Sequence, residues 1–366
     1  MNRSNAGWKY SIDFRMLSIL LLIAVVPILL GTWWFITSYE QTYLEAQGKS
    51  LAEAAEMGST YLNTYLGNRI IEIAGLTEVP VLREIIEKGN QDLQKDLKQV
   101  RQGIISTEAR WGGLDYSAPE LRAVLDNPAS DFLQRYAAIR TSYREIIVTD
   151  FLGRTVAATG KTSNYHHAND VWWKEAYADG QKGAVYIGTV HYHESAKIYS
   201  FDIAQPFVDP NGGVIGIMMV GIDAQDINAL LGSLRSSFDS TAALLQTDGR
   251  VISALGYGTL DKRTFPDADA IIDAQQKGKR YIIGQSEPRN IYGLASRNFL
   301  DTYPHLKWVL TISNPVQTVI SPLSSLWRNV LGLVLAVVVI NFLITLWLSR
   351  GESKPIIEED AHLEKL

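Results

Sequence analysis

The stretch IIVTDFLGRTVAATG, residues 146–160, has the pattern of a β-hairpin. An apolar, β-branched run leads to Thr149, a turn follows that contains Asp150 and Gly153, and a second strand begins after Arg154. Gly and Asp in the turn suit the tight backbone that joins two antiparallel strands. We therefore predict two paired strands at this point of the chain.

The hairpin pattern occurs a second time, as LLQTDGRVISALG, residues 244–256. Thr149-Asp150 matches Thr247-Asp248, and Gly153-Arg154 matches Gly249-Arg250. Each copy opens a run of short strand candidates that ends on an aliphatic strand, GVIGIMMVGID in the first and KWVLTISNP in the second. We predict two related α+β modules, at residues 143–225 and 239–315, joined by the helical segment DAQDINALLGSLRSS.

The composition bounds the possible functions. The chain has 366 residues, of which 46% are hydrophobic and 20% charged, with no cysteine and a formal charge of −5. The acidic balance argues against a nucleic-acid partner, which requires clustered Lys and Arg. The absence of cysteine excludes disulfides and thiolate metal ligands. Because the sequence contains no nucleophile elbow, phosphate-binding loop or dinucleotide fingerprint, we expect neither an enzyme nor a cofactor.

Two uncharged or nearly uncharged stretches are long enough to cross a membrane as helices, residues 16–37 and 326–349. Basic residues before the first stretch and after the second place residues 1–15 and 350–366 in the cytoplasm. Residues 38–325 then lie outside. The prediction is a double-pass protein of the cell (inner) membrane. A separate or missing cytoplasmic signalling domain would receive the signal, because the predicted cytoplasmic tail is short.

The outer segment begins with helical patterns over residues 38–142. Small and apolar residues recur at three- and four-residue steps over Tyr39 to Leu76, which predicts one long amphipathic helix that continues the first span. This helix packs either along its own domain or against a second copy in a homodimer. Two more helical stretches follow, and Asn127-Pro128 interrupts the last one.

An aromatic pair opens a short helix at Trp172-Trp173, Gln205-Pro206-Phe207 ends a strand, and Gly213-Val214-Ile215-Gly216 leads to Asp223. Together with the two spans and the long first helix, these motifs resemble the double Cache sensor domains of prokaryotic transmembrane receptors. The resemblance implies a long N-terminal helix and two tandem PAS-like antiparallel-sheet modules, flanked by two transmembrane helices. It also implies that the first module is membrane-distal and binds a small ligand, in receptors for chemotaxis or two-component signalling.

The resemblance also implies a ligand site. Family members that bind amino acids carry a Tyr, an Arg five positions later, a Trp-aromatic pair and a distant Asp. This chain has Tyr165 but places Asp170 where the Arg is expected. A carboxylate repels an amino acid's carboxylate and attracts an ammonium group, and indole rings attract cations. We therefore predict a cationic amine as the ligand. The predicted ligand-binding residues are Tyr165, Asp170, Trp172, Trp173, Tyr192, Glu194, Asp202 and Asp223.

Other interpretations of these residues stay open. Asp170 can serve as the N-cap of the helix that follows it, and Trp172 can be a core residue. The ligand can be an amino acid or another small metabolite. Strand alternation puts His191 and His193 on one face, where they could hold Zn²⁺ or Ni²⁺ together with Glu194 and a histidine of the His166-His167 pair. Finally, the chain can be a structural or assembly protein of the membrane without a ligand.

Overall fold

The computed structural model describes residues 14–91, 97–180, 182–194, 197–238, 240–261, 263–296, 306 and 308–350. The predicted cytoplasmic tail lies outside these residues, as does nearly all of the predicted cytoplasmic N-terminus. The chain divides into two units. One is Gly48–Pro315, and the other combines Met1–Gln47 with Val316–Leu366.

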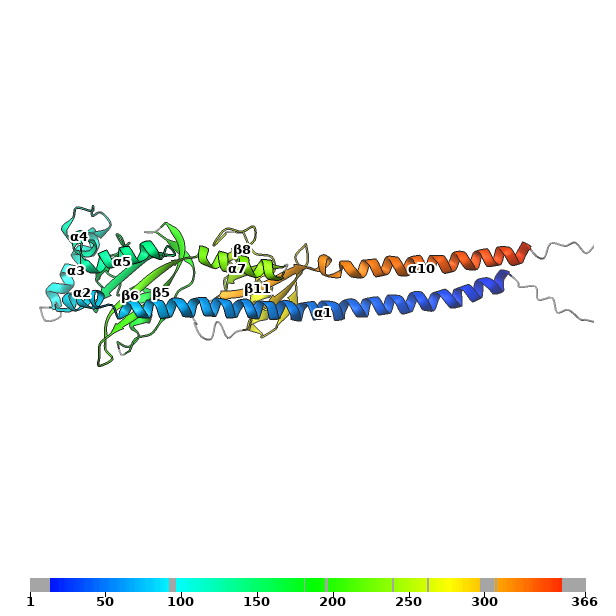
Figure 1. Cartoon of the computed structure of the whole chain (residues 1–366), viewed down its shortest axis with the longest axis horizontal. Helices are drawn as coiled ribbons and strands as arrows, with labels where there is room; N and C mark the ends of the chain where they lie inside the picture. Colours follow the sequence, from blue (N-terminus) through cyan, green and yellow to red (C-terminus); the bar gives the residue numbers. More distant parts are fainter. Residues whose placement is uncertain are drawn as a thin grey trace, which may run out of the picture. The chain divides into compact units, whose positions relative to one another are not determined.

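The first module is built on an antiparallel sheet in the order β2-β1-β6-β5-β3, with β4 paired to β5 (Figure 1). Long apolar runs form its central strands, which are buried along nearly their whole length. Its strands are β1 (Tyr143–Asp150), β2 (Thr155–Ala158), β3 (Tyr186–Ile187), β4 (His191–His193), β5 (Ile198–Val208) and β6 (Val214–Asp223).

The second module repeats this topology. Its antiparallel strands follow the order β8-β7-β11-β10-β9, which is the first order with each strand replaced by its counterpart. This confirms the predicted fold class, an α+β chain with two tandem antiparallel sheets after a long helix. The strands are β7 (Thr241–Gln246), β8 (Val251–Ala254), β9 (Tyr281–Ile283), β10 (Asn290–Leu294) and β11 (Trp308–Pro315).

The two hairpins are equivalent, but the predicted residue match was wrong by two positions at its start. The Asp150 N–H donates to the Arg154 carbonyl, and the Gln246 N–H donates in the same way to Arg250. Gly153 and Gly249 both have positive φ, at 80° and 84°. Asp150 therefore corresponds to Gln246 rather than to Asp248. The sequence match had introduced a gap, whereas the two turns have the same length.

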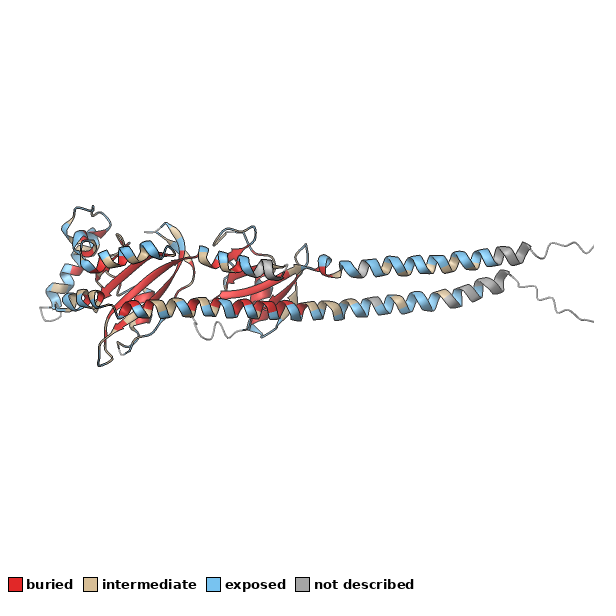
Figure 2. Cartoon of the chain, in the orientation of Figure 1, coloured by how far each residue is buried: buried red, intermediate tan, exposed pale blue. Residues whose placement is uncertain are grey.

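A short helix covers one face of each sheet. In the first module this is α6 (Val171–Tyr177), which packs on β5 and β6. In the second it is α8 (Ala268–Gln276), whose apolar residues join a core with strands of that sheet. Figure 2 shows the strands of both sheets as largely buried.

The long helix α1 (Phe14–Thr77) meets both modules on the side away from these short helices. In the first module the Gln205 side chain donates to the Ile70 carbonyl at 2.6 Å. In the second, Gly293 of β10 lies directly against the backbone of Leu51 and Ala52, with no room for a Cβ atom. The helix therefore contacts the first module through a hydrogen bond to its backbone and the second through a close backbone approach.

The remaining helices of this unit confirm the predicted helical stretches. Asn127 caps the helix after the predicted break, because its Oδ1 accepts from the Ser130 N–H at 2.9 Å. Whether α1 also pairs with a second copy stays a prediction. These helices are α2 (Pro80–Asn90), α3 (Leu97–Trp111), α4 (Pro119–Leu125), α5 (Pro128–Ile139) and, between the modules, α7 (Gln225–Phe238).

The other unit contains α10 (Val316–Arg350), which begins at the residue after β11. Among the described residues, Ser325–Ile344 is the one helical segment apolar and long enough to cross a membrane. In the corresponding part of α1, the described apolar side chains Leu22, Trp33 and Trp34 are exposed. A double-pass topology therefore stays a prediction.

Replacing Arg154 with Met should destabilise the chain by about 3–5 kcal/mol, because it leaves the Asp150 carboxylate buried without its cation. Asp150 is fully buried and lies 2.6 Å from the Arg154 Nε. The equivalent Arg250 pairs with Asp248 at the surface, where both side chains are half exposed. Arg250→Met should therefore change the unfolding free energy by less than about 0.5 kcal/mol. Urea unfolding of the full chain in detergent measures the unfolding free energy of both variants. Equal losses of stability would contradict the conclusion that only the buried Asp150–Arg154 pair is needed for stability.

Replacing Gly293 with Ala should cost about 1–3 kcal/mol, because the added methyl group forces α1 away from β10. Gly232 in α7 is the matched control, since nothing lies within 4 Å of the place its Cβ would take. Gly232→Ala should instead stabilise the chain by up to about 1 kcal/mol through helix propensity. A thermal midpoint unchanged by Gly293→Ala would contradict the close packing of α1.

Candidate functional site

The two adjacent tryptophans lie under α6 as part of the core. Trp172 and Trp173 are buried against Ile147, Ile217 and Met219 of the sheet. The Trp173 indole N–H donates to the Thr149 hydroxyl at 3.0 Å, which satisfies its polar group. Their indole rings therefore form an apolar floor between α6 and the sheet.

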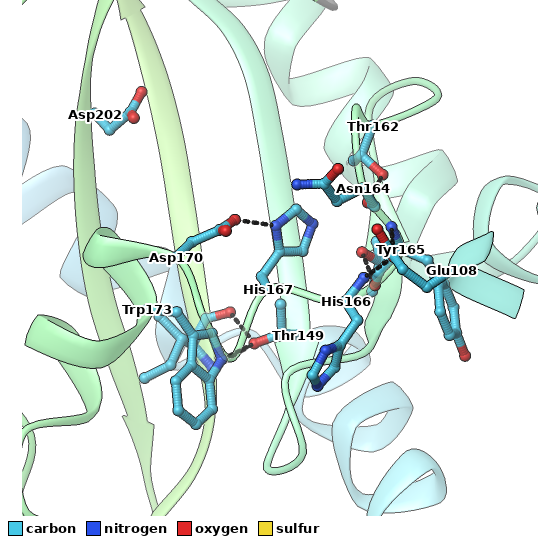
Figure 3. Close-up of polar contacts among 12 residues, drawn as sticks. Glu108, Thr149, Thr162, Asn164, Tyr165, His166, His167, Asp170, Trp173 and Asp202 are labelled. Carbon is cyan, nitrogen blue, oxygen red and sulfur yellow. Dashed lines mark hydrogen bonds and ion pairs between the residues drawn. The ribbon is translucent and has the colours of Figure 1, made fainter. Parts of the chain in front are cut away.

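The Asp170 carboxylate does not cap α6, although the residue occupies the N-cap position. Its Oδ2 lies 2.7 Å from Nδ1 of His167, as Figure 3 shows. The His167 ring is buried beside Trp172, with the ring centroids 5.1 Å apart. An imidazole thus fixes Asp170 at the edge of the tryptophan floor.

Two further carboxylates enter the same face of the sheet from neighbouring strands. Asp202 of β5 and Glu145 of β1 both lie opposite Gly221 of the intervening strand β6. Because Gly221 has no side chain, it leaves space between the two acids, and a Cβ there would lie 3.7 Å from Oδ1 of Asp202. Asp202 is 7% exposed and Glu145 only 4%. Two acids are thus buried in one part of the sheet.

The histidines of β4 face these acids, and the predicted alternation is confirmed for them. The Nε2 atom of His193 lies 3.0 Å from Glu145 Oε2, and Nε2 of His191 lies 3.6 Å from Asp202 Oδ2. Burial lowers the pKa of His193, but the hydrogen bond and charge of Glu145 outweigh burial and raise it above its ordinary value. Glu145 and Asp202 thus each form an ion pair with an imidazole.

The pKa of Asp202 depends on the charges of several of these groups. Burial raises its pKa, His191 and His193 lower it, and the charges of Glu145 and Asp170 raise it further, so that the net direction is upward. Asp170 is therefore close enough to repel Asp202. We call this set the carboxylate–imidazole cluster. It consists of Glu145, Asp170, His191, His193 and Asp202.

Four of the predicted ligand-binding residues have other surroundings. The Tyr165 ring packs on Trp111 at 5.1 Å, and Asp223 accepts two bonds from the Arg144 guanidinium at 2.9 and 3.0 Å. Tyr192 is exposed and packs on Tyr199, and Glu194 is exposed. The structure thus brings Asp170, Trp172 and Asp202 near one another. Ligand binding by any of the predicted residues stays a prediction.

Sequence reasoning missed Glu145 and the contact between His167 and Asp170. A signal for Glu145 existed, because it lies two strand positions from Ile147, which is in the tryptophan core. His167 lies in a loop without periodicity, so that no sequence pattern placed its ring beside Trp172.

A separate cavity of about 740 Å³ lies on the other side of Trp173, between α3 and α6. Its walls are mainly apolar and include Ile104, Phe151 and Tyr177. The one acid in the lining, Glu108, accepts two backbone bonds, from the Tyr165 and His166 N–H groups. Arg101 also lines this cavity, which otherwise offers mainly apolar surface.

Comparison with solved structures finds similar folds in bacterial receptors. The ligand-binding domain of the Pseudomonas fluorescens chemoreceptor CtaA, solved with L-isoleucine, is 12% identical at a TM-score of 0.47, over 77% of this chain and 98% of that one. The ligand-binding domain of the Campylobacter jejuni chemoreceptor Tlp3, solved with L-norvaline, is 11% identical at 0.46, over 76% and 94%.

The extracellular domain of the putative histidine kinase rpHK1S-Z16 is 12% identical at a TM-score of 0.40, over 70% of this chain and 98% of that one. Neither a protein-family model nor a curated protein sequence matches the chain.

Proposed function

We propose that this chain is the sensor of a membrane receptor and that it binds a small cationic amine in its first module. The observation that carries the proposal is the meeting of three carboxylates, from Glu145, Asp170 and Asp202, beside the tryptophan floor of α6. Among the described residues, each of these acids forms an ion pair with an imidazole: Asp170 with His167, Asp202 with His191, and Glu145 with His193.

The charge of the cluster favours a cation. An imidazole is positively charged only when it is protonated, whereas an ammonium group of ordinary pKa stays charged at neutral pH. An ammonium group brings a permanent charge and several N–H donors, and hydrogen bonds from it to carboxylates are roughly twice as strong as neutral ones. The same carboxylates would repel an anion.

The apolar floor gives the ligand's carbon chain a surface to pack on. Trp172 packs against the ring of His167, which in turn bonds the Asp170 carboxylate, so that Trp172 lies near this acid. Where an indole face borders a cation it adds about 0.5–2 kcal/mol of attraction. In this proposal Trp172 forms one wall of the site, and Trp173 supports it from the core.

A route for the signal follows from chain continuity. Pro315 ends β11, and α10 with its apolar segment Ser325–Ile344 begins at the next residue. Residues 16–37 and 326–349 would anchor the chain in the cell membrane, with the modules outside. Ligand would shift the second span within a homodimer, and a cytoplasmic signalling domain would read this shift. The ligand can change the equilibrium between the two arrangements only by the difference in its binding free energy for them.

Isothermal calorimetry of the full chain in detergent, with EDTA and an amine-free buffer, tests the proposal. A panel of mono-, di- and quaternary amines should give binding heats. Asp202→Asn should weaken binding about tenfold to a hundredfold, since a hydrogen bond to a charged group contributes about 1.5–3 kcal/mol. Asp248→Asn makes the same change of charge at an exposed site in the second module and should leave the affinity unchanged.

The panel also includes amino acids and neutral alcohols of matched length. Binding heats from amino acids alone would contradict the proposal that the ligand is an amine and would support an amino-acid sensor. Flat titrations with every compound would contradict a sensor of this ligand class, as would equal losses in Asp202→Asn and Asp248→Asn.

A further inference from the structure

Three strands bring metal-ligand groups together at one end of the cluster. His191 and His193 come from β4 and Asp202 from β5, and one ligand atom from each lies within 4.8 Å of the others. Glu145 of β1 adds a fourth group, 3.0 Å from Nε2 of His193. Two imidazoles and two carboxylates thus converge from separate elements of a rigid sheet.

The hydrogen bonds of His191 prepare it for a metal. Its Nδ1 lies 3.3 Å from the Thr189 carbonyl, which can only accept, so Nδ1 carries the proton. In the neutral ring Nε2 then has the free lone pair, and this is the nitrogen that faces Asp202. An outer-shell carbonyl that fixes the tautomer in this way is typical of histidine ligands.

A second observation points to a missing positive charge. Asp202 is 93% buried, and its Oδ1 has no hydrogen-bond partner among the described residues. This oxygen faces the space left by Gly221, on the side of Glu145. Burying an ionised oxygen without a partner is costly, and a bound cation would remove that cost.

We infer that His191, His193 and Asp202 form a site for a divalent transition-metal ion, with Glu145 as a further ligand. Imidazole nitrogen with carboxylate oxygen suits Zn²⁺, Ni²⁺ or Cu²⁺ better than Mg²⁺ or Ca²⁺, which prefer oxygen alone. Two carboxylates balance the two charges of the ion.

The site has one accessible side. The side chain of His191 is 43% exposed, whereas the side chains of His193 and Asp202 are only 11% and 10% exposed. An ion can therefore enter past His191 and keep a coordination position open to solvent. The metal and the proposed amine would share Asp202 and Glu145, but His191 and His193 serve the metal alone and Asp170 serves the amine alone, so that variants of these residues distinguish the two.

Calorimetry of the EDTA-stripped, dialysed full chain in detergent, titrated with ZnCl₂, NiCl₂ and MgCl₂, tests the inference. Zn²⁺ or Ni²⁺ should bind at one ion per chain, and Mg²⁺ should give no heat. His191→Ala and His193→Ala should each weaken binding by more than the roughly 10–100-fold that loss of an outer-shell partner costs. The control is His166→Ala, whose ring bonds the Leu152 carbonyl outside the cluster.

An independent measurement guards against misfolded variants. Co²⁺ bound by this set should give visible absorption bands in the wild-type chain and in His166→Ala, and lose them in His191→Ala, while thermal unfolding confirms that each variant is folded. Zn²⁺ binding that survives both β4 substitutions, or that is lost equally in His166→Ala, would overturn the inference. Since the amine titration contains EDTA, failure of one proposal leaves the other measurable.

Discussion

The first module depends on the burial of the Asp202 carboxylate. A buried ionised group is stable only with a partner of opposite charge or with enough hydrogen bonds. The charged neighbours of Asp202 are the imidazoles of His191 and His193 and the carboxylates of Glu145 and Asp170, and burial raises its pKa more than any of them changes it. We propose that the sheet holds these acids in place for a cation.

The duplication shows that this arrangement belongs to the first module. In β10, the counterpart of β5, the residues that face the covering helix are Tyr292 and Leu294, and they join an apolar core. The same strand order therefore supports an apolar interior in one module and a charged one in the other. A glycine at position 221 and acids on both flanking strands make the difference.

The sequence predicted the modules well because hairpins and amphipathic helices have local signals. The Gly153 turn, the strand alternation of His191 and His193, and the helix break at Asn127-Pro128 all depend on neighbours in the chain. The contacts of the cluster had no such local signal, because its residues are far apart in the sequence. Glu145, for example, reaches His193 from 48 positions away.

Hydrogen–deuterium exchange of the full chain, with and without a small cation that binds it, tests the central claim most directly. If the cluster holds positive charge, protection should increase in β4, β5 and the segment from His167 to Tyr177, where the cluster and its tryptophan floor lie. Protection confined to the second module, or to the apolar cavity between α3 and α6, would contradict the account.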